Sequence, residues 1–301
     1  MPGKILVSGA SGPIGAALLP SLKAAGYGVT RLVHGAPSGD QQIHWNPAEP
    51  LSPDSVSGFE AVVHLAGESI VGRWTEGKKQ RIRESRVLGT RNLAQALAKT
   101  MQRPRVFISG SAIGYYGDRG DEILREQSSS GEGFLPEVCR AWEAAAQLAA
   151  AAGIRTACLR TGVVLSTVGG ALPKMLPPFR LGLGGNIGNG RQWMSWIHVQ
   201  DLVGAIHHIL KTDLLQGPVN GVSPRALTNA EFTKTLAAVL GRPAIFPMPA
   251  FAARLAFGQM AEELLLASQR VEPAALVASG YPFQYSDLTK ALNDLLQKRA
   301  R

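Results

Sequence analysis

Short apolar runs alternate along this chain with longer segments in which apolar residues recur at helical spacing. Apolar runs of this length are typical of strands that are buried on both faces of a parallel sheet. Such runs occupy residues 5–7, 28–33, 61–65, 105–109 and 155–160, and helical spacing occupies residues 81–98 and 136–152. Because strands alternate with helices, the pattern predicts an α/β fold with a Rossmann-type, doubly wound parallel sheet.

The first apolar run ends in a glycine-rich turn with the spacing Gly9-x-x-Gly12-x-x-Gly15. Between a strand and a helix, Gly9 permits a tight turn, Gly12 lets backbone amides approach a pyrophosphate, and Gly15 lets the helix pack on the strand. A diphosphate bound there would lie at the positive end of the helix. The apolar pattern of the next helix and its stop at Gly26 agree with this context. They favour a dinucleotide site over an ordinary βα turn.

The later part of the chain has a different character and predicts a smaller, mainly helical lobe. Thr228 and Glu231 have the spacing of a capping box, and the helix that they open is expected to end at Gly241. The glycine-rich segment 181–190 fits two alternatives, a mobile loop over a cleft or a pair of tight turns, because glycine marks both.

Composition limits the possible classes of protein. With 301 residues, 45% of them hydrophobic, the chain can bury a sizeable core, and no apolar stretch or leader-like start predicts a membrane or secreted protein, so we expect the cytoplasm. The net charge of +9 is compatible with an acidic partner, but the basic residues are scattered among acidic ones, which predicts no nucleic-acid partner. The spacings of Cys139, Cys158 and the histidines predict packed, reduced thiols and no metal site.

Several further segments carry a resemblance to a known family. They are HLAG (64–67), SRVLGTRNL (85–93), SGSAIGYYG (109–117), RTGVVL (160–165), SWIHVQDLV (195–203) and a carboxyl-terminal segment that begins QRVEPAALVASGYPFQY. With the glycine turn, they make the chain similar to extended short-chain dehydrogenases/reductases. It most closely resembles their atypical epimerase-family branch, the relatives of sugar-nucleotide epimerases that carry a characteristic carboxyl-terminal module. The resemblance covers nearly the whole chain.

The resemblance implies two domains and a set of cofactor contacts. Residues 1–165 would form an NADP-binding Rossmann domain, and residues 166–301 a substrate lobe and carboxyl-terminal module, with 195–222 returning to the Rossmann core. The implied cofactor contacts are Gly9, Ser11, Gly12, Pro13, Ile14 and Gly15 at the pyrophosphate, and Leu65, Ala66 and Gly67 beside the riboses. Ser109 would join them, because the carboxyl ends of neighbouring parallel strands meet at one crevice.

The residues after the second strand predict which nicotinamide cofactor is bound. NAD-specific sites place an acidic residue about 20 residues after the glycines, where it holds the ribose 2′-hydroxyl. Segment 31–36 has no acidic residue and contains Arg31 and His34. Nothing there repels a 2′-phosphate, which favours NADP as the cofactor. Arg31 has the alternative of being an ordinary surface residue of a strand.

The resemblance also implies catalytic residues, and part of that set is missing. Members of the superfamily use a Tyr-x-x-x-Lys pair on the long helix, with a Ser or Thr that holds the substrate oxygen. Here the two helix positions hold Leu135 and Cys139. The candidates that remain are Ser111, to orient a substrate hydroxyl, and Tyr116, to exchange a proton. Packing and hydrogen bonding within its own loop is the alternative for Tyr116.

For several other polar and aromatic residues the sequence allows both a functional and a structural role. Arg86 stands where many family members have an asparagine, and it could bind a phosphate, a carboxylate or the cofactor, or form a salt bridge on its helix. Trp142 and Trp193 could flank a flat substrate or pack in the interior. The resemblance implies that His198 and Asp201 brace the loop that carries the substrate lobe.

Two functions follow from these observations. The first is an NADP-dependent oxidoreductase or epimerase that acts on a small hydroxylated substrate, either nucleotide-linked or otherwise anionic, without the usual Tyr-x-x-x-Lys pair. The alternative is an NADP(H)-binding regulator or scaffold that acts through a protein partner, for example in cell division. We expect no membrane partner. A homodimer through helices 81–98 and 136–152 is possible, as in relatives.

Overall fold

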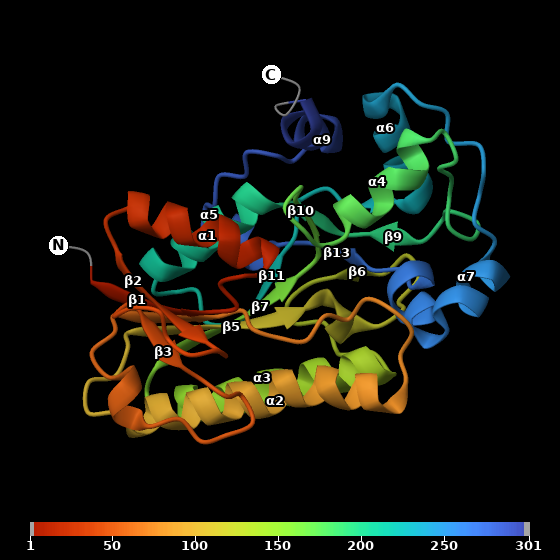
Figure 1. Cartoon of the computed structure of the whole chain (residues 1–301). Helices are drawn as coiled ribbons and strands as arrows, with labels where there is room; N and C mark the ends of the chain where they lie inside the picture. Colours follow the sequence, from red (N-terminus) through yellow and green to blue (C-terminus); the bar gives the residue numbers. More distant parts are fainter. Residues whose placement is uncertain (1–2, 298–301) are drawn as a thin grey trace.

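A seven-stranded parallel sheet lies at the centre of the computed structural model, which describes residues 3–297 (Figure 1). In spatial order its strands are β11 (Gly217–Gly221), β7 (Arg155–Thr161), β5 (Val106–Ala112), β4 (Ala61–His64), β1 (Lys4–Ser8), β2 (Gly28–Val33) and β3 (Gln42–His44). The order reverses between β1 and β4, and ligands of such sheets bind at the carboxyl ends of the strands at this point. The predicted Rossmann-type α/β fold is confirmed.

Helices cover both faces of the sheet. The helices α1 (Pro13–Ala24) and α5 (Val199–Lys211) pack on one face, and α2 (Glu76–Lys99) and α3 (Phe134–Ala151) lie side by side on the other (Figure 1). Successive residues of a strand point to opposite faces, so Val7 enters the core under α1 and α5, while Leu6 enters the core over α2 and α3. This is why the strands are apolar on both sides.

The boundaries of the two long helices differ from the prediction. Helix α2 begins before residue 81 because the Thr75 hydroxyl accepts a hydrogen bond from the Lys78 amide and so caps a polar first turn. Helix α3 begins at Phe134, ahead of Pro136, which is tolerated in the first turn because its missing N–H has no helical partner there. Strand β3 lies outside the apolar runs from which the strands were predicted.

A second hydrophobic core is formed by elements from the carboxyl-terminal half of the chain. Its elements are β8 (Val163–Leu165), α4 (Leu172–Arg180), β10 (Trp196–His198), α6 (Asn229–Leu240) and α9 (Leu288–Gln297). Buried Asp201, at the start of α5, accepts hydrogen bonds from the Gln284 and Tyr285 amides, both 2.9 Å long, and so ties this lobe to the Rossmann core. The Thr228–Glu231 capping box and the left-handed stop at Gly241 are as predicted.

Short elements complete the described chain. They are η1 (Pro53–Val56), η2 (Ile113–Tyr116), β6 (Ile123–Leu124), β9 (Trp193–Met194), β12 (Leu227–Thr228), α7 (Ala250–Phe257), the π-helix η3 (Ala261–Leu266), β13 (Arg270–Val271) and α8 (Ala274–Ala278). From residue 3 to residue 297, no helix is both long and apolar enough to cross a membrane.

The glycine-rich segment 181–190 adopts the tight-turn alternative. Its backbone runs beside a later segment, and the Phe246 amide donates to the Gly184 carbonyl at 3.1 Å while the Met248 amide donates to the Asn186 carbonyl at 2.8 Å. The turns use positive φ angles of 73° at Gly182 and 61° at Gly188. The segment is therefore fixed against its neighbour along its length.

Candidate functional site

The glycine turn between β1 and α1 is built by two glycines that the fold itself requires. Gly9 has a φ of +70°, and a Cβ placed on it would lie 2.6 Å from the Leu65 carbonyl carbon. A Cβ on Gly15 would lie 2.4 Å from the Gly9 carbonyl oxygen. Neither distance is possible for a real side chain, so these glycines let β4 and α1 approach the turn.

Gly12 differs from its two neighbours in the motif. The nearest atom to a Cβ built on it is the Gly9 carbonyl oxygen at 3.4 Å, an ordinary contact distance. Gly12 is also the N-cap of α1, and no side chain of the described chain caps that helix or places an acidic group in its first turn. The space beside Gly12 and the unpaired amides of α1 suit an anion such as a pyrophosphate. The predicted group fits this turn.

The strand ends beside the turn are held by a buried polar network that the sequence analysis missed. The Ser8 hydroxyl lies 2.6 Å from His64 Nδ1 and accepts a hydrogen bond from the Leu65 amide, while His64 Nε2 lies 3.0 Å from the Thr90 hydroxyl. Burial lowers the pKa of His64 to about 4, so the ring is neutral at pH 7. The sequence did contain a signal for this network, because Ser8 and His64 are polar residues that end two buried strands.

The predicted ribose contacts lie where β4 leaves the sheet. Leu65 and Ala66 follow its last residue beside Gly9, and exposed Gly67 comes next. At the neighbouring strand, Arg31 lies on β2 opposite Val7, and exposed His34 directly follows β2, with its ring 5.7 Å from that of Trp45. Arg31 and His34, the residues predicted to favour NADP, therefore lie on and just beyond the strand beside the glycine turn.

Ser109 takes a different position from the one expected. Its side chain is completely buried, and the hydroxyl donates to the Gly110 carbonyl at 3.2 Å. A side chain with no exposed surface cannot meet a cofactor in the crevice, so Ser109 serves the interior of the strand end.

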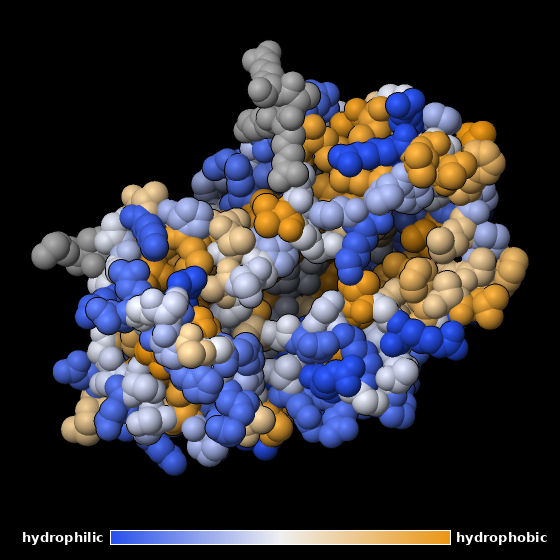
Figure 2. Space-filling view, in the orientation of Figure 1, coloured by the Kyte–Doolittle hydropathy of each residue, from blue (hydrophilic) through white to orange (hydrophobic). Residues whose placement is uncertain are grey.

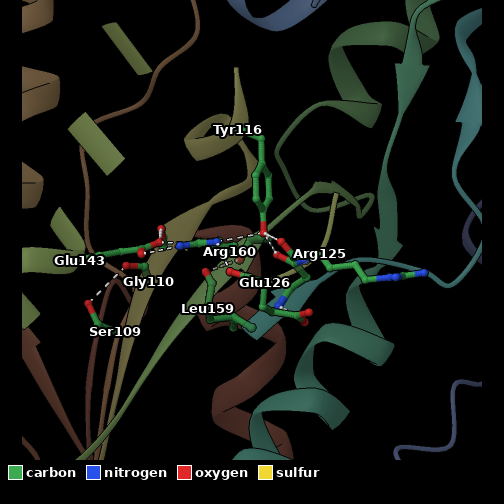
Figure 3. A network of polar contacts seen from close by, with 11 residues as sticks. Ser109, Gly110, Tyr116, Arg125, Glu126, Glu143, Leu159 and Arg160 are labelled. Atoms are coloured by element: carbon green, nitrogen blue, oxygen red, sulfur yellow. Dashed lines mark hydrogen bonds and ion pairs between the residues drawn. The ribbon is translucent and has the colours of Figure 1, made fainter. Parts of the chain in front are cut away.

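A buried network of polar side chains holds Ser111, the first catalytic candidate. The Ser111 hydroxyl donates to Glu143 Oε1 at 2.6 Å, and Arg160 Nε and Nη2 donate to the two oxygens of the same carboxylate at 2.8 and 2.9 Å. Figure 3 shows the Arg160 guanidinium between Glu143 and Tyr116. Burial alone would lower the pKa of Arg160, but its bonds to Glu143 outweigh burial and raise the pKa, so the ion pair is kept.

Tyr116, the second candidate, is fully buried in the same network. Its hydroxyl accepts from Arg160 Nη1 at 3.0 Å and lies 2.8 Å from Asn220 Oδ1 and 3.0 Å from the Arg125 carbonyl, one of which takes its proton. Burial raises the pKa of Tyr116 above its ordinary value. The structure thus shows the packed alternative: this hydroxyl links η2 to β7 and β11 instead of facing the crevice.

The helix face that carries the catalytic pair in related enzymes is apolar here. Leu135, Cys139 and Trp142 are buried and follow one another at helical spacing on α3. Burial, helped by the negative charge of Glu143, raises the pKa of Cys139 to about 12. The thiol is therefore neutral at pH 7 and cannot supply the positive charge of a lysine.

Arg86 lies on α2, and its side chain reaches the segment that follows β4, opposite this helix face. A Cβ on Gly67 would lie 3.2 Å from the guanidinium carbon, which is itself 5.1 Å from the centroid of the Trp142 ring. Nη1 donates to the Glu68 carbonyl at 2.9 Å and to the Ile82 carbonyl at 3.3 Å. No ion pair joins Arg86 to another residue of its helix within residues 3–297, so the salt-bridge alternative does not hold.

The carboxyl-terminal module reaches α3 and fixes its beginning. Glu263 accepts hydrogen bonds from the Phe134 and Leu135 amides at 3.2 and 2.7 Å and so caps α3. Buried Met260 packs in the same cluster as Leu135, Trp74 and Ile82. A surface hollow of about 600 Å³ between the starts of α2 and α3 is lined by none of the predicted site residues.

The remaining aromatic and histidine candidates have structural roles. Trp193 donates from Nε1 to Asp121 at 2.7 Å, and Arg270 lies over its ring. His198 is completely buried, stacks on Tyr285 and pairs with Asp294 at 3.5 Å. Within residues 3–297, no group of His, Cys, Asp and Glu side chains could hold a metal ion.

Taken together, the glycine turn at the strand-order reversal and the open N-terminus of α1 define a dinucleotide-binding α/β protein. On the face shown in Figure 2 the surface is hollowed near its centre, between the Rossmann layers and the carboxyl-terminal lobe. The model of the NAD dependent epimerase/dehydratase family matches residues 5–220, and that of a domain of unknown function, DUF1731, matches residues 248–295. The chain belongs to the NAD dependent epimerase/dehydratase family, and the predicted carboxyl-terminal module is confirmed.

Relatives and solved structures agree with this assignment. An epimerase family protein of Mycobacterium tuberculosis is 41% identical over 290 residues, which is 96% of each chain. The crystal structure of human epimerase family protein SDR39U1 with NADPH matches with a TM-score of 0.90 and 37% identity, over 98% of this chain and 99% of the human chain. A nucleoside-diphosphate sugar epimerase from Corynebacterium glutamicum matches with a TM-score of 0.83 and 40% identity, over 98% of this chain and 58% of that chain.

Proposed function

We propose that the protein binds NADP(H) at the β1–α1 turn and acts as an oxidoreductase or epimerase on a small hydroxylated substrate. The observation that carries this proposal is the space beside Gly12 at an uncapped helix N-terminus, which a Cβ would fill and a pyrophosphate fits. The human relative that carries NADPH and the relative described as a nucleoside-diphosphate sugar epimerase support the cofactor and the substrate class.

The choice of NADP over NAD follows from the end of β2. Segment 31–36 has no carboxylate to hold a ribose 2′-hydroxyl or to repel a 2′-phosphate, and Arg31 and His34 lie on and just after that strand. A cationic side chain at this place attracts the 2′-phosphate, while an acidic one would exclude it. NADP is therefore the proposed cofactor.

The chemistry proposed for this chain relies on Ser111 instead of a tyrosine. A nicotinamide bound here would accept a hydride from a carbinol carbon of the substrate or supply one to a carbonyl carbon, and the proton of the hydroxyl would be exchanged with solvent. A carboxylate only accepts hydrogen bonds, so the Ser111 proton is committed to Glu143 and the hydroxyl presents its lone pairs. Ser111 is thereby suited to accept a hydrogen bond from a substrate hydroxyl. Tyr116 takes no part, because its hydroxyl is occupied in the interior.

Binding and turnover together test this proposal. Calorimetric titration should show that NADPH binds, and NADPH-linked turnover should appear with a member of a panel of ketones, hydroxy acids and sugar nucleotides. Ser111→Ala should lower that turnover about tenfold or more with little change in NADPH affinity. Tyr116→Phe, in the same network, is the matched control and should keep the NADPH affinity and the turnover. Tight NADPH binding without turnover of any panel member would count against the catalytic proposal.

The assembly and the location of the protein stay predictions. A homodimer through α2 and α3, the absence of nucleic-acid and membrane partners, and residence in the cytoplasm all rest on the sequence and the family resemblance.

A further inference from the structure

The guanidinium of Arg86 has two donor atoms that the protein does not use. Nη1 is bound to the Glu68 and Ile82 carbonyls, whereas Nε and Nη2 have no hydrogen-bond partner between residues 3 and 297. The side chain is only partly buried, so these atoms are accessible to a ligand. The nearest carboxylate, on Glu68, forms its ion pair with Lys78 instead.

The same chain shows what these two atoms can hold. In Arg160 the Nε and Nη2 atoms donate in parallel to the two oxygens of Glu143 at 2.8 and 2.9 Å. This side-on fork matches the geometry of a planar carboxylate. Arg86 has the same fork with no carboxylate of the described chain in it.

The surroundings of Arg86 are apolar and restrict the rest of the ligand. The guanidinium lies over the Trp142 ring, and Cys139 on the same face of α3 is close enough for the two groups to interact electrostatically. Trp142 Nε1 is buried and has no hydrogen-bond partner within the described residues. Leu135 continues this face into a cluster with buried Trp74 and Met260. Buried Leu135 and Trp142 therefore offer an apolar wall to the body of a ligand held by Arg86.

Arg86 also lies beside the part of the crevice where a nicotinamide would bind. A Cβ on Gly67 would lie 3.2 Å from the guanidinium carbon, so Arg86 lies close to Gly67, which follows the carboxyl end of β4 and is a predicted ribose contact. A ligand held by its fork would therefore lie between that ribose and the apolar face of α3.

From this placement we propose that Arg86 and the face of α3 formed by Leu135, Cys139 and Trp142 bind the carboxylate of a small substrate with a flat, apolar body. The proposal rests on the proposed function, because it places this ligand next to a bound NADP(H). It narrows the substrate from hydroxylated compounds in general to hydroxy or keto carboxylic acids. It also assigns Arg86 to the substrate and not to the cofactor.

Benzoate is a suitable probe because it combines a carboxylate with a flat apolar ring. The NADPH-loaded full chain is titrated by calorimetry with benzoate, with benzyl alcohol, which has the ring but no charge, and with inorganic phosphate, which has charge but no ring. Benzoate should bind at least tenfold more tightly than either control compound. Phosphate binding tighter than benzoate, or equal binding of benzyl alcohol, would overturn the carboxylate assignment.

Substitutions of Arg86 then test whether benzoate binds at this side chain. Arg86→Gln should weaken benzoate at least tenfold, and Arg86→Lys should weaken it severalfold, because lysine keeps the charge but loses the fork. Arg91→Gln, an equal loss of charge at an exposed position of the same helix, should leave benzoate affinity within twofold of wild type. Unchanged benzoate affinity in both Arg86 variants would overturn the proposal. Arg86→Lys serves if the glutamine variant does not fold.

Measuring NADPH affinity distinguishes a failure of this proposal from a failure of the proposed function. NADPH affinity should stay within about twofold of wild type in Arg86→Lys and Arg86→Gln. A parallel loss of NADPH affinity would assign Arg86 to the cofactor and overturn the carboxylate subsite alone. A wild-type protein that binds no NADPH would overturn the proposed function, and benzoate binding would then be measured without it.

Discussion

The two ends of the crevice differ in how closely they follow the pattern that the family resemblance implies. The cofactor end is the β1–α1 turn, and the catalytic end is formed by α3 with Ser111 and Arg160. At the β1–α1 turn, Gly9 and Gly15 meet backbone atoms so closely that only glycine fits, and Gly12 leaves the space that a pyrophosphate needs. At the two positions of α3 where the family resemblance implies a tyrosine and a lysine, this chain has Leu135 and Cys139. Dinucleotide binding and proton transfer are therefore separable properties of this fold, because different elements supply them.

The framework of the catalytic end nevertheless remains in place. Glu143 still links α3 to Arg160 on β7 and to Ser111 on β5, so three elements keep their relative positions although the tyrosine and lysine are absent. An apolar wall and an unused guanidinium fork lie beside that framework. The difference between the two ends points to changed substrate chemistry around a conventional cofactor.

Substitution of Glu143 should have the largest effect on stability, because it removes the hydrogen bonds that link α3, β5 and β7 at the catalytic end. Glu143→Ala leaves the buried Arg160 guanidinium without its carboxylate, and such losses cost about 3–5 kcal/mol of unfolding free energy. Urea unfolding monitored by tryptophan fluorescence measures it. The double variant Glu143→Leu with Arg160→Met, which removes both charges, should recover a large part of this loss. A single variant as stable as wild type would show that the pair is not a structural link.

Acid should weaken the cofactor end through His64. Its pKa is about 4 in the folded protein and near 6.5 when unfolded, so the unfolded chain binds the extra proton between these values. Stability is therefore fully present above pH 6.5 and falls by about 3 kcal/mol as the pH drops to 4. Urea unfolding at several pH values should show a smaller fall in His64→Gln. Parallel pH profiles for the two proteins would refute a buried neutral His64.

Gly12 and Gly15 should separate ligand binding from folding at the cofactor end. Gly12→Val places its side chain in the pyrophosphate space, so NADPH affinity should fall about 100-fold or more, or ~2.7 kcal/mol, while the protein stays folded. Gly15→Val instead overlaps the Gly9 carbonyl and should lower stability by about 1–3 kcal/mol. Calorimetric titration and thermal unfolding distinguish the two. Full NADPH affinity in folded Gly12→Val would remove the pyrophosphate assignment.

The sequence predicted the fold well because its signals are local. Strand β2 falls on the predicted residues 28–33, and the capping box at Thr228 and the stop at Gly241 form as expected, since each depends on residues close in the chain. The glycine turn was also predictable, because strand, turn and helix are consecutive.

The catalytic end was less predictable because its contacts cross the chain. Tyr116 as a proton donor could be judged only once Asn220 and Arg160 were seen to occupy its hydroxyl. The capping of α3 by Glu263 joins positions more than a hundred residues apart, and no local pattern reports it. Such long-range polar contacts depend on how the sheet orders its strands.

The smallest expected effect is on the ratio of the NADPH and NADH affinities at the cofactor end. Wild type should bind NADPH more tightly than NADH, because no carboxylate lies between Arg31 and Ala36 and β2 carries the cationic side chain of Arg31. His34→Asp should place a negative charge near the 2′-phosphate and an acceptor near the 2′-hydroxyl of NAD. We expect the ratio of affinities to shift toward NAD by about tenfold, or ~1.4 kcal/mol, because position 34 is exposed and ions in the solvent screen the introduced carboxylate.

Salt concentration sharpens the same test. An exposed phosphate contact weakens as ions screen it, so the wild-type preference for NADPH should narrow between low and high ionic strength, whereas NADH affinity should change little. Calorimetric titration of both cofactors into wild type and His34→Asp at two salt concentrations measures all four ratios. Equal NADH and NADPH affinities in wild type, or no shift on substitution, would mean that His34 does not face the ribose. The selectivity of the cofactor end would then have to come from Arg31 alone or be absent.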